Sequence, residues 1–153
     1  MDTTGGARQQ PTCAGALLGT WTLESCTTEH HDTGEKTEPF GAHPRGFLSY
    51  GADGRMYAII VREGRKPPRG VIPTGAEKIE LFTGMGSYAG TYSVEADVVN
   101  HHVEISWLEA WTGTTQVRHF KLEGELLYIR SPVARDLLDG RPSSATLVWA
   151  RAS

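Results

Sequence analysis

Three consecutive segments between Ser87 and Leu122 alternate polar and apolar residues, and this alternation limits the fold more than any other feature of the sequence. Successive side chains of an extended strand point to opposite faces, so a period of two predicts strands with one face in a core. The first segment, 87–95, places four residues together on one face: Tyr88, Gly90, Tyr92 and Val94. The prediction is a set of neighbouring strands whose inner face carries tyrosines.

The second and third segments carry the residues best suited to chemistry. In the second, the more apolar face takes alternate residues: Val99, His101, Val103, Ile105 and Trp107. His102 then points to the opposite, solvated face. In the third, Phe120 marks the inner face, and the alternation carries Gln116 and Arg118 inward with it. A closed sheet would gather these polar side chains over an apolar floor, which is how small-molecule sites are commonly built.

The remaining chain reads as further strands joined by turns. They are expected at 17–28, 46–50, 55–62, 125–130 and 144–151. The inward residues of the first are expected to be Trp21, Leu23, Ser25 and Thr27, and those of the next two Leu48, Tyr50, Met56, Ala58 and Ile60. Eight sequential strands predict an all-β fold, an eight-stranded antiparallel up-and-down barrel, and this size leaves room for one small ligand.

One short helix is expected, at 74–86. Thr74 and Glu77 have the spacing of a capping box, and the apolar residues that follow fall on one stripe. Such a stripe favours a helix that packs over one end of the sheet. The basic, proline-rich segment 63–73 cannot form a central strand because proline lacks the amide donor, so it is interpreted as a surface loop and a candidate lid.

Composition limits the remaining choices. A chain of 153 residues is typical of one domain, and we expect a disordered leader at 1–15 followed by a barrel domain at 16–153. The leader has no apolar run and is neither a signal peptide nor a spanning helix, which favours a cytoplasmic location. A net charge of -3 argues against nucleic-acid and membrane partners. Cys26 is interpreted as a small apolar filler.

Several segments resemble the lipocalin-like domain family of small bacterial and fungal cytoplasmic proteins. They are LLGTW, PFGAHPRGFLSYGADGRMYA, YAGTYSV, VNHHVE and TTQVRHFKLEGELL, in that order. Gly19-Thr20-Trp21 is similar to the G-x-W signature of lipocalins, and Arg151 stands where that fold often lays an arginine over the tryptophan. The resemblance spans 17–151 and implies the barrel. It also carries over His101, Gln116 and Arg118 as site residues, although the family includes both carriers and cofactor-free enzymes.

The candidate catalytic residues are His101, Arg118 and Tyr88. Imidazole titrates near neutrality, so His101 could act as a general acid or base, but a histidine on an apolar face could equally be a core residue held by tyrosine or backbone partners. Arg118 inside a barrel needs a carboxylate, a carbonyl array or an anionic ligand such as a carboxylate, enolate or phenolate. The expected ligand-binding residues are Gln116, Tyr92, Tyr50, Trp107, Phe120, Met56 and Ser25.

No metal or cofactor is expected. The six histidines include no His-x-His pair, and loop histidines such as His30, His31 and His43 are usually solvated. Haem ligation by one axial histidine such as His101 has no further support in the sequence.

Two classes of function fit this pocket equally. One is a cofactor-independent cyclase or isomerase acting on a small, partly apolar molecule with a carbonyl or enol group, as in secondary metabolism. The other is a carrier or sensor that binds such a molecule unchanged. The expected partner is a small molecule, and an exposed rim of valine and tryptophan is compatible with a homodimer.

Overall fold

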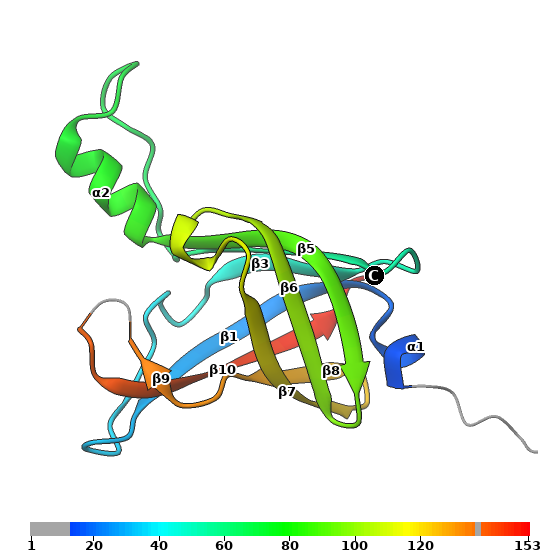
Figure 1. The fold of residues 1–153 in the computed structure, drawn as a ribbon. Helices are drawn as coiled ribbons and strands as arrows, with labels where there is room; N and C mark the ends of the chain where they lie inside the picture. Colours follow the sequence, from blue (N-terminus) through cyan, green and yellow to red (C-terminus); the bar gives the residue numbers. More distant parts are fainter. Residues whose placement is uncertain (1–12, 137–138) are drawn as a thin grey trace, which may run out of the picture.

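The chain forms one closed β-barrel with a projecting arm (Figure 1). The structure is a computed structural model, and it describes residues 13–136 and 139–153. Its strands are β1 Gly19–His30, β2 Lys36–Thr37, β3 Arg45–Tyr50, β4 Arg55–Val61, β5 Met85–Glu95, β6 Val98–Ser106, β7 Thr115–Glu123, β8 Leu126–Arg130, β9 Ala134–Arg135 and β10 Pro142–Arg151. The helices are α1 Cys13–Leu17, α2 Gly75–Thr83 and the 3₁₀ turn η1 Glu109–Trp111.

Eight strands close the barrel, as the alternating pattern predicts. Antiparallel neighbours run in the order β1-β3-β4-β5-β6-β7-β8-β10, and β10 pairs with β1 to complete the ring. The short strands β2 and β9 extend this sheet beyond β1 and β10 and were not expected from the sequence. Closure pairs every long strand on both sides, so it leaves none of them as an unpaired edge.

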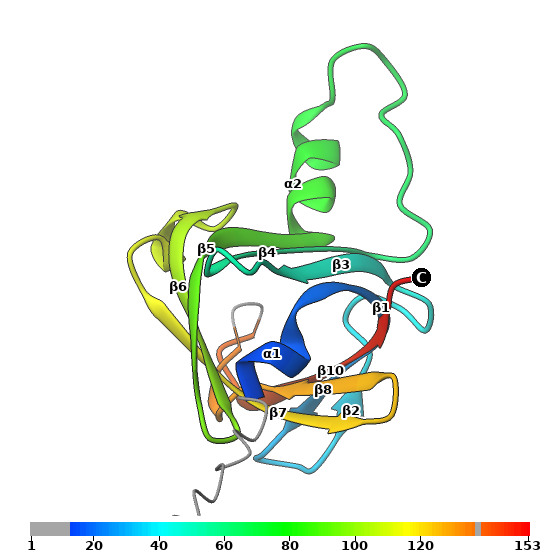
Figure 2. The same ribbon diagram turned by 90° about the vertical axis from the view of Figure 1, so that its right-hand side faces the viewer.

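The N-terminal end of the barrel is closed by packing around Trp21. This side chain is fully buried, and its indole nitrogen donates to the Leu17 carbonyl at 2.9 Å. The Arg151 guanidinium lies over the Trp21 ring at 4.2 Å, as the resemblance implies. It also donates hydrogen bonds to the backbone carbonyls of Ala16 and Leu18. Helix α1 lies at this end of the barrel (Figure 2). Residues 13–15 of the expected leader belong to α1, and its remainder, 1–12, lies outside the described residues.

Two β-bulges change which residues face inward. In β1 the register shifts between Leu23 and Ser25, so that Cys26 takes the inner face and Ser25 pairs with Val148 on the outer face. The expected inward positions of Ser25 and Thr27 are therefore wrong. Cys26 is buried as expected, and burial raises the pKa of its thiol to about 12.

The second bulge lies in β6, where Ala89 and Gly90 of β5 pair with Ile105 and Val103 and leave Glu104 as the extra residue. Val103 remains buried before it, whereas Ile105 is 70% exposed on the outer face, so the expected inward position of Ile105 is wrong. A Cβ atom at Gly90 would collide with the carbonyl oxygen of His102. Glycine is therefore needed where the two strands approach most closely.

The segment 62–84, here called the arm, stands away from the barrel (Figures 1 and 2). Helix α2 has the predicted capping box: Thr74 and Glu77 each accept a hydrogen bond from the other's backbone amide. The helix buries no residue, however, and Ile79 is 70% exposed. The expected packing of the helix over the sheet is wrong because Val61 pairs directly with Met85, so the chain leaves and re-enters the sheet at the same place.

Candidate functional site

His101 is the centre of a polar cluster inside the barrel. It lies on the inner face of β6 and is 2% exposed. Its Nε2 atom lies 2.8 Å from the Tyr50 hydroxyl of β3, and its Nδ1 atom lies 2.7 Å from the Tyr88 hydroxyl of β5. A neutral imidazole carries one donor and one acceptor, so one tyrosine donates to the ring and the other accepts from it. The sequence left two roles open for His101, a general acid or base and a core residue held by tyrosines. The observed geometry is compatible with both roles.

Arg118 lies beside this cluster on β7. The pairing of β6 with β7 sets His101 opposite Gln116 and Val99 opposite Arg118. The guanidinium donates to Gln116 Oε1 at 3.3 Å and to the Val117 carbonyl at 2.8 Å. It also lies close enough to Tyr88 to lower the pKa of that hydroxyl. None of the carboxylates in the described parts of the chain forms an ion pair with Arg118. Its positive charge is therefore held by neutral acceptors only.

The barrel interior keeps the other members of the cluster uncharged. Burial, followed by the positive charges of Arg118 and His102, lowers the pKa of His101 to about 3. Burial raises the pKa of Tyr50 well above its usual value, and it raises that of Tyr88 despite the opposing effect of Arg118. At neutral pH the site is one guanidinium among neutral donors and acceptors. The expectation that His101 titrates near neutrality is therefore wrong.

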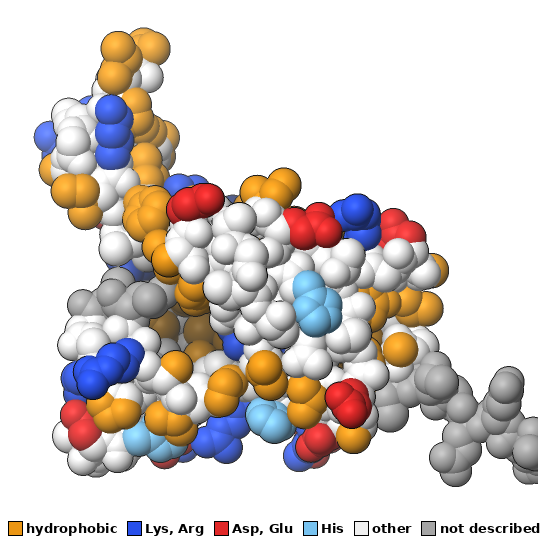
Figure 3. All heavy atoms as spheres, in the orientation of Figure 1, with side chains coloured by type: hydrophobic (Ala, Val, Ile, Leu, Met, Phe, Trp, Pro, Cys, Tyr) orange, Lys and Arg blue, Asp and Glu red, His pale blue; other side chains and the backbone are white. Residues whose placement is uncertain are grey.

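A series of aromatic rings leads from this cluster to the end of the barrel opposite α1. Tyr88 meets Trp111 of η1 edge-on, with ring centroids 5.8 Å apart, and Trp111 meets Trp107 at 5.5 Å. Trp107 then meets Phe82 of the arm at 5.8 Å. Figure 3 shows the molecule hollowed at this end, with hydrophobic side chains inside the recess. Tyr88 is therefore the member of the cluster that connects His101 with the open end.

The structure brings together most of the predicted site residues. Tyr50, Tyr88, His101, Gln116 and Arg118 form the cluster. Tyr92 joins it through an edge contact with Tyr50 at 4.9 Å, and its hydroxyl donates to the Gly51 carbonyl.

The other predicted ligand-binding residues lie elsewhere. Met56 and Phe120 belong to the apolar core, and Trp107 lies at the open end, where its indole donates to the Phe82 carbonyl. Ser25 faces outward and is not part of the site. Trp111 was missed as a site neighbour because it follows the strand on η1, where the alternation no longer applies.

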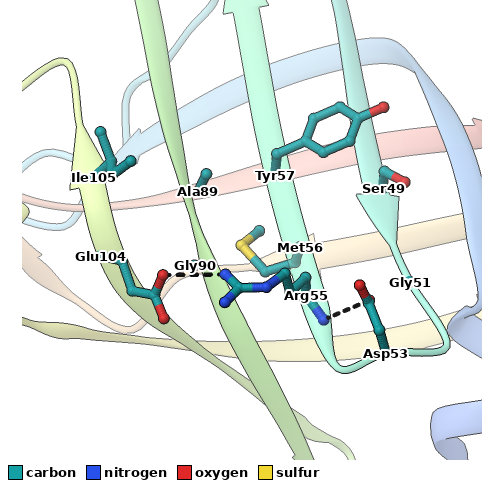
Figure 4. Close-up of a pocket in the computed structure, with 10 residues that line it drawn as sticks. All are labelled: Ser49, Gly51, Asp53, Arg55, Met56, Tyr57, Ala89, Gly90, Glu104 and Ile105. Carbon is teal, nitrogen blue, oxygen red and sulfur yellow. Dashed lines mark hydrogen bonds and ion pairs between the residues drawn. The ribbon is translucent and has the colours of Figure 1, made fainter.

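A groove on the outer face of the sheet differs from the lumen in its charges. It has a volume of about 390 Å³ and lies over β3, β4, β5 and β6, next to the bulge at Gly90 (Figure 4). Its charged residues are already engaged: Arg55 pairs with Glu104 at 3.2 Å, and the Asp53 carboxylate accepts from the Arg55 amide at 3.1 Å. Because its one cation is paired with a carboxylate, the groove is a weaker candidate than the lumen.

The loop histidines do not converge on a metal site. His30 is the last residue of β1 and is 5% exposed, so the expectation that it is solvated is wrong, whereas His31 and His43 are exposed. Among residues 13–136 and 139–153, no group of three or more His, Cys, Asp or Glu side chains is placed to hold a metal ion. Within the same ranges, no helix is long and apolar enough to cross a membrane.

The closed barrel and its cluster define a class of protein, a β-barrel whose architecture suggests binding of a small hydrophobic ligand. A family model described as a lipocalin-like domain matches residues 18–152. The chain therefore belongs to the lipocalin-like domain family, as its ordered motifs indicate. A search of curated proteins finds no match to the chain.

Proposed function

We propose that the barrel binds a small, partly apolar molecule with a carbonyl or enol group and catalyses a cofactor-independent isomerisation or cyclisation of it, of the natural-product type. The observation that carries the proposal is Arg118, a half-buried guanidinium beside Tyr88 without an ion pair to any described carboxylate. Such a group is suited to an oxygen that becomes negative during reaction. Gln116 would orient the guanidinium through its side-chain oxygen.

Proton transfer in this proposal centres on Tyr88 and His101. Removal of a proton from a carbon next to the substrate carbonyl would give an enolate, whose oxygen Arg118 would hold. Tyr88 would accept that proton while passing its own hydroxyl proton to Nδ1 of His101, and the pair would return a proton at a second position. The substrate then becomes an isomer with no net gain or loss of atoms, so the reaction needs no cofactor.

The low pKa of His101 is compatible with this role once an anion is bound. The positive charge of Arg118 is one cause of the low value, and an enolate on the guanidinium would offset that charge. The histidine would therefore become a better base as the enolate forms. The pKa of His101 with an enolate on Arg118 would therefore be higher than about 3.

A carrier is the second candidate, and one observation favours it. Both ring nitrogens of His101 already have tyrosine partners inside a nearly closed core, so the residue has a structural role without any reaction. In that case Arg118 and Gln116 would anchor the ligand, and the aromatic and aliphatic lining would supply affinity.

The deciding experiment starts from native mass spectrometry of the protein purified from its own cells, before and after incubation with a metabolite extract. A retained compound that is released with altered mass, or with the same mass and a shifted retention time, supports the enzyme. A compound released unchanged supports the carrier and overturns the catalytic proposal.

Variants then test the anchor. Arg118→Met should lose most of its affinity for the recovered compound, because the oxygen would lose its charged partner, whereas Arg130→Met on the exposed end of β8 should keep it. Equal affinity of wild type and Arg118→Met would overturn the role of Arg118 in both candidates.

A further inference from the structure

A second concave site lies between the arm and the barrel, outside the lumen. This pocket has a volume of about 650 Å³ and is formed by the start of β3, the end of β4, the first part of the arm and Leu81 of α2. Four basic residues line it, and none of its lining residues is acidic: Arg45, Arg62, Arg65 and Lys66. Basic side chains are also visible on the arm in Figure 3. The pocket is strongly cationic in a chain whose net charge is -3.

The basic side chains of this cationic pocket are not neutralised. Arg62 donates to the Pro39 carbonyl at 3.3 Å and Arg65 to the Leu81 carbonyl at 3.2 Å, and these acceptors carry no net charge. Across the described parts of the chain, no carboxylate forms an ion pair with any of the four.

Two acidic side chains of the arm accept hydrogen bonds from backbone amides. Glu63 accepts a hydrogen bond from the His43 amide at 3.2 Å. Glu77 accepts from the amides of Thr74 and Arg69, at 3.0 and 2.9 Å. These two carboxylates therefore accept hydrogen bonds from backbone amides, and neither forms an ion pair with a cation of the pocket.

The chemistry of the pocket selects a ligand class. Guanidinium groups match the geometry of phosphate oxygens, and a multiply charged anion would relieve the repulsion among four clustered cations. Val61 and Leu81 add apolar surface beside them. A volume of about 650 Å³ is in the range of small-molecule pockets. We propose that the cationic pocket is a second ligand site, which binds the phosphate end of an organic phosphate.

This site goes beyond the function proposed for the lumen. The pocket shares no residue with the cluster around His101, so a variant that removes its charges leaves the lumen intact. Failure of the inference therefore leaves the proposed function standing, and failure of the proposed function leaves the pocket standing.

The first test is a calorimetric titration of the full chain with inorganic pyrophosphate, at about 50 mM salt so that charge interactions are not screened away. The double variant Arg45→Ser/Lys66→Ser removes two exposed cations that make no hydrogen bond or ion pair through their side chains within the described residues. The matched control, Arg130→Ser/Lys36→Ser, removes the same two residue types from exposed positions on β8 and β2.

We expect saturable binding by wild type, at least about tenfold weaker binding by the pocket variant, and less than about twofold change in the control. An absence of saturable binding by wild type would overturn the site. Equal weakening in both variants would also overturn it, because the effect would then come from net charge alone.

A second arm of the experiment distinguishes the source of the phosphate. The tip of the arm exposes Val71 and Ile72, at 102% and 78%, next to Arg69. The probe is co-sedimentation with phosphatidylcholine vesicles that contain about one-fifth phosphatidylglycerol. Sedimentation that is lost in both the pocket variant and Ile72→Ser assigns the phosphate to a lipid headgroup. Pyrophosphate binding without sedimentation assigns it to a free phosphorylated compound, and sedimentation that persists in the pocket variant overturns the lipid source.

Discussion

Each tyrosine of the cluster has a different relation to His101 and to the rest of the barrel. Tyr50 is almost fully buried and ends the hydrogen-bonded series, whereas Tyr88 also contacts Arg118 and Trp111. Only Tyr88 can therefore link the imidazole to a ligand that enters from the open end. Removing its hydroxyl should affect the function proposed for the lumen more than removing that of Tyr50.

The first prediction concerns the hydrogen bond of Tyr88. Tyr88→Phe should lower the free energy of unfolding by about 1 to 2 kcal/mol, since it leaves a buried imidazole nitrogen without its partner. Tyr57→Phe, on the exposed outer face of β4, should stay within about 0.5 kcal/mol of wild type. Urea unfolding at pH 7 measures both. Equal values for the two variants would mean that the bond to His101 contributes nothing to stability.

The second prediction concerns the pH dependence of stability. The pKa of His101 is about 3 in the folded chain and 6.5 for an unperturbed histidine, so between these values the unfolded chain binds the extra proton. Stability should therefore rise with pH over this range, by up to about 1.4 kcal/mol per pH unit from this residue. The contribution is fully present above pH 6.5 and is lost as the pH falls toward 3.

A matched pair of variants isolates this contribution. His101→Gln cannot be protonated and should unfold with a shallower pH dependence than wild type between pH 4 and 6.5. His31→Gln removes an exposed histidine and should keep the wild-type slope. A wild-type slope in His101→Gln would show that other groups cause the pH dependence.

At the level of elements, α2 is a helix stabilised mainly by its own sequence. Because it buries no residue, its capping box contributes to the arm and not to the barrel core. Thr74→Ala should therefore weaken the helix by about 1 kcal/mol. The loss should appear as faster hydrogen exchange at the amides of α2, while the urea midpoint of the barrel stays unchanged, and Thr74→Ser should restore protection. A shifted midpoint would mean that α2 is coupled to the core.

The same elements show what sequence patterns can predict. Period two identifies all eight barrel strands, and the capping box identifies α2, because both depend on neighbouring residues. The bulges carry no such local mark, since one extra residue in a strand leaves its composition unchanged. Alternation alone therefore predicts the wrong face for Ser25 and Ile105. The apolar stripe of α2 is equally ambiguous, because the pattern alone does not show whether the stripe packs against the same chain.

Part of the candidate site is also predictable from local sequence patterns, and part depends on the closed barrel. Alternation predicted that His101, Gln116 and Arg118 face inward, and pairing of β6 with β7 makes them neighbours. The contact between Tyr50 and His101 joins strands that are not paired with each other, so it depends on closure of the barrel. The pKa of His101 depends on the same closure, because burial is its largest cause.

For the whole molecule, closure of the barrel depends on contacts between its first strand, β1, and its last strand, β10. Arg151 near the C-terminus covers Trp21 and donates to carbonyls of Ala16 and Leu18. Arg151→Ala should lower the free energy of unfolding by about 1 to 2 kcal/mol, through the lost cation–π contact and hydrogen bonds. Arg151→Lys should recover only part of this, because an ammonium cannot stack on the indole and reach both carbonyls. Thermal unfolding should therefore rank wild type above Arg151→Lys and Arg151→Lys above Arg151→Ala. A stability of Arg151→Lys equal to that of wild type would contradict this prediction.

The aromatic series between the arm and the cluster gives the protein an optical reporter. Trp111 and Trp107 lie along the path to His101, while Trp21 and Trp149 are buried in the core. A planar ligand entering from the open end would reach the first pair and leave the second screened. Intrinsic fluorescence should therefore separate into a ligand-sensitive and a ligand-insensitive component, so that occupancy can be followed without a label.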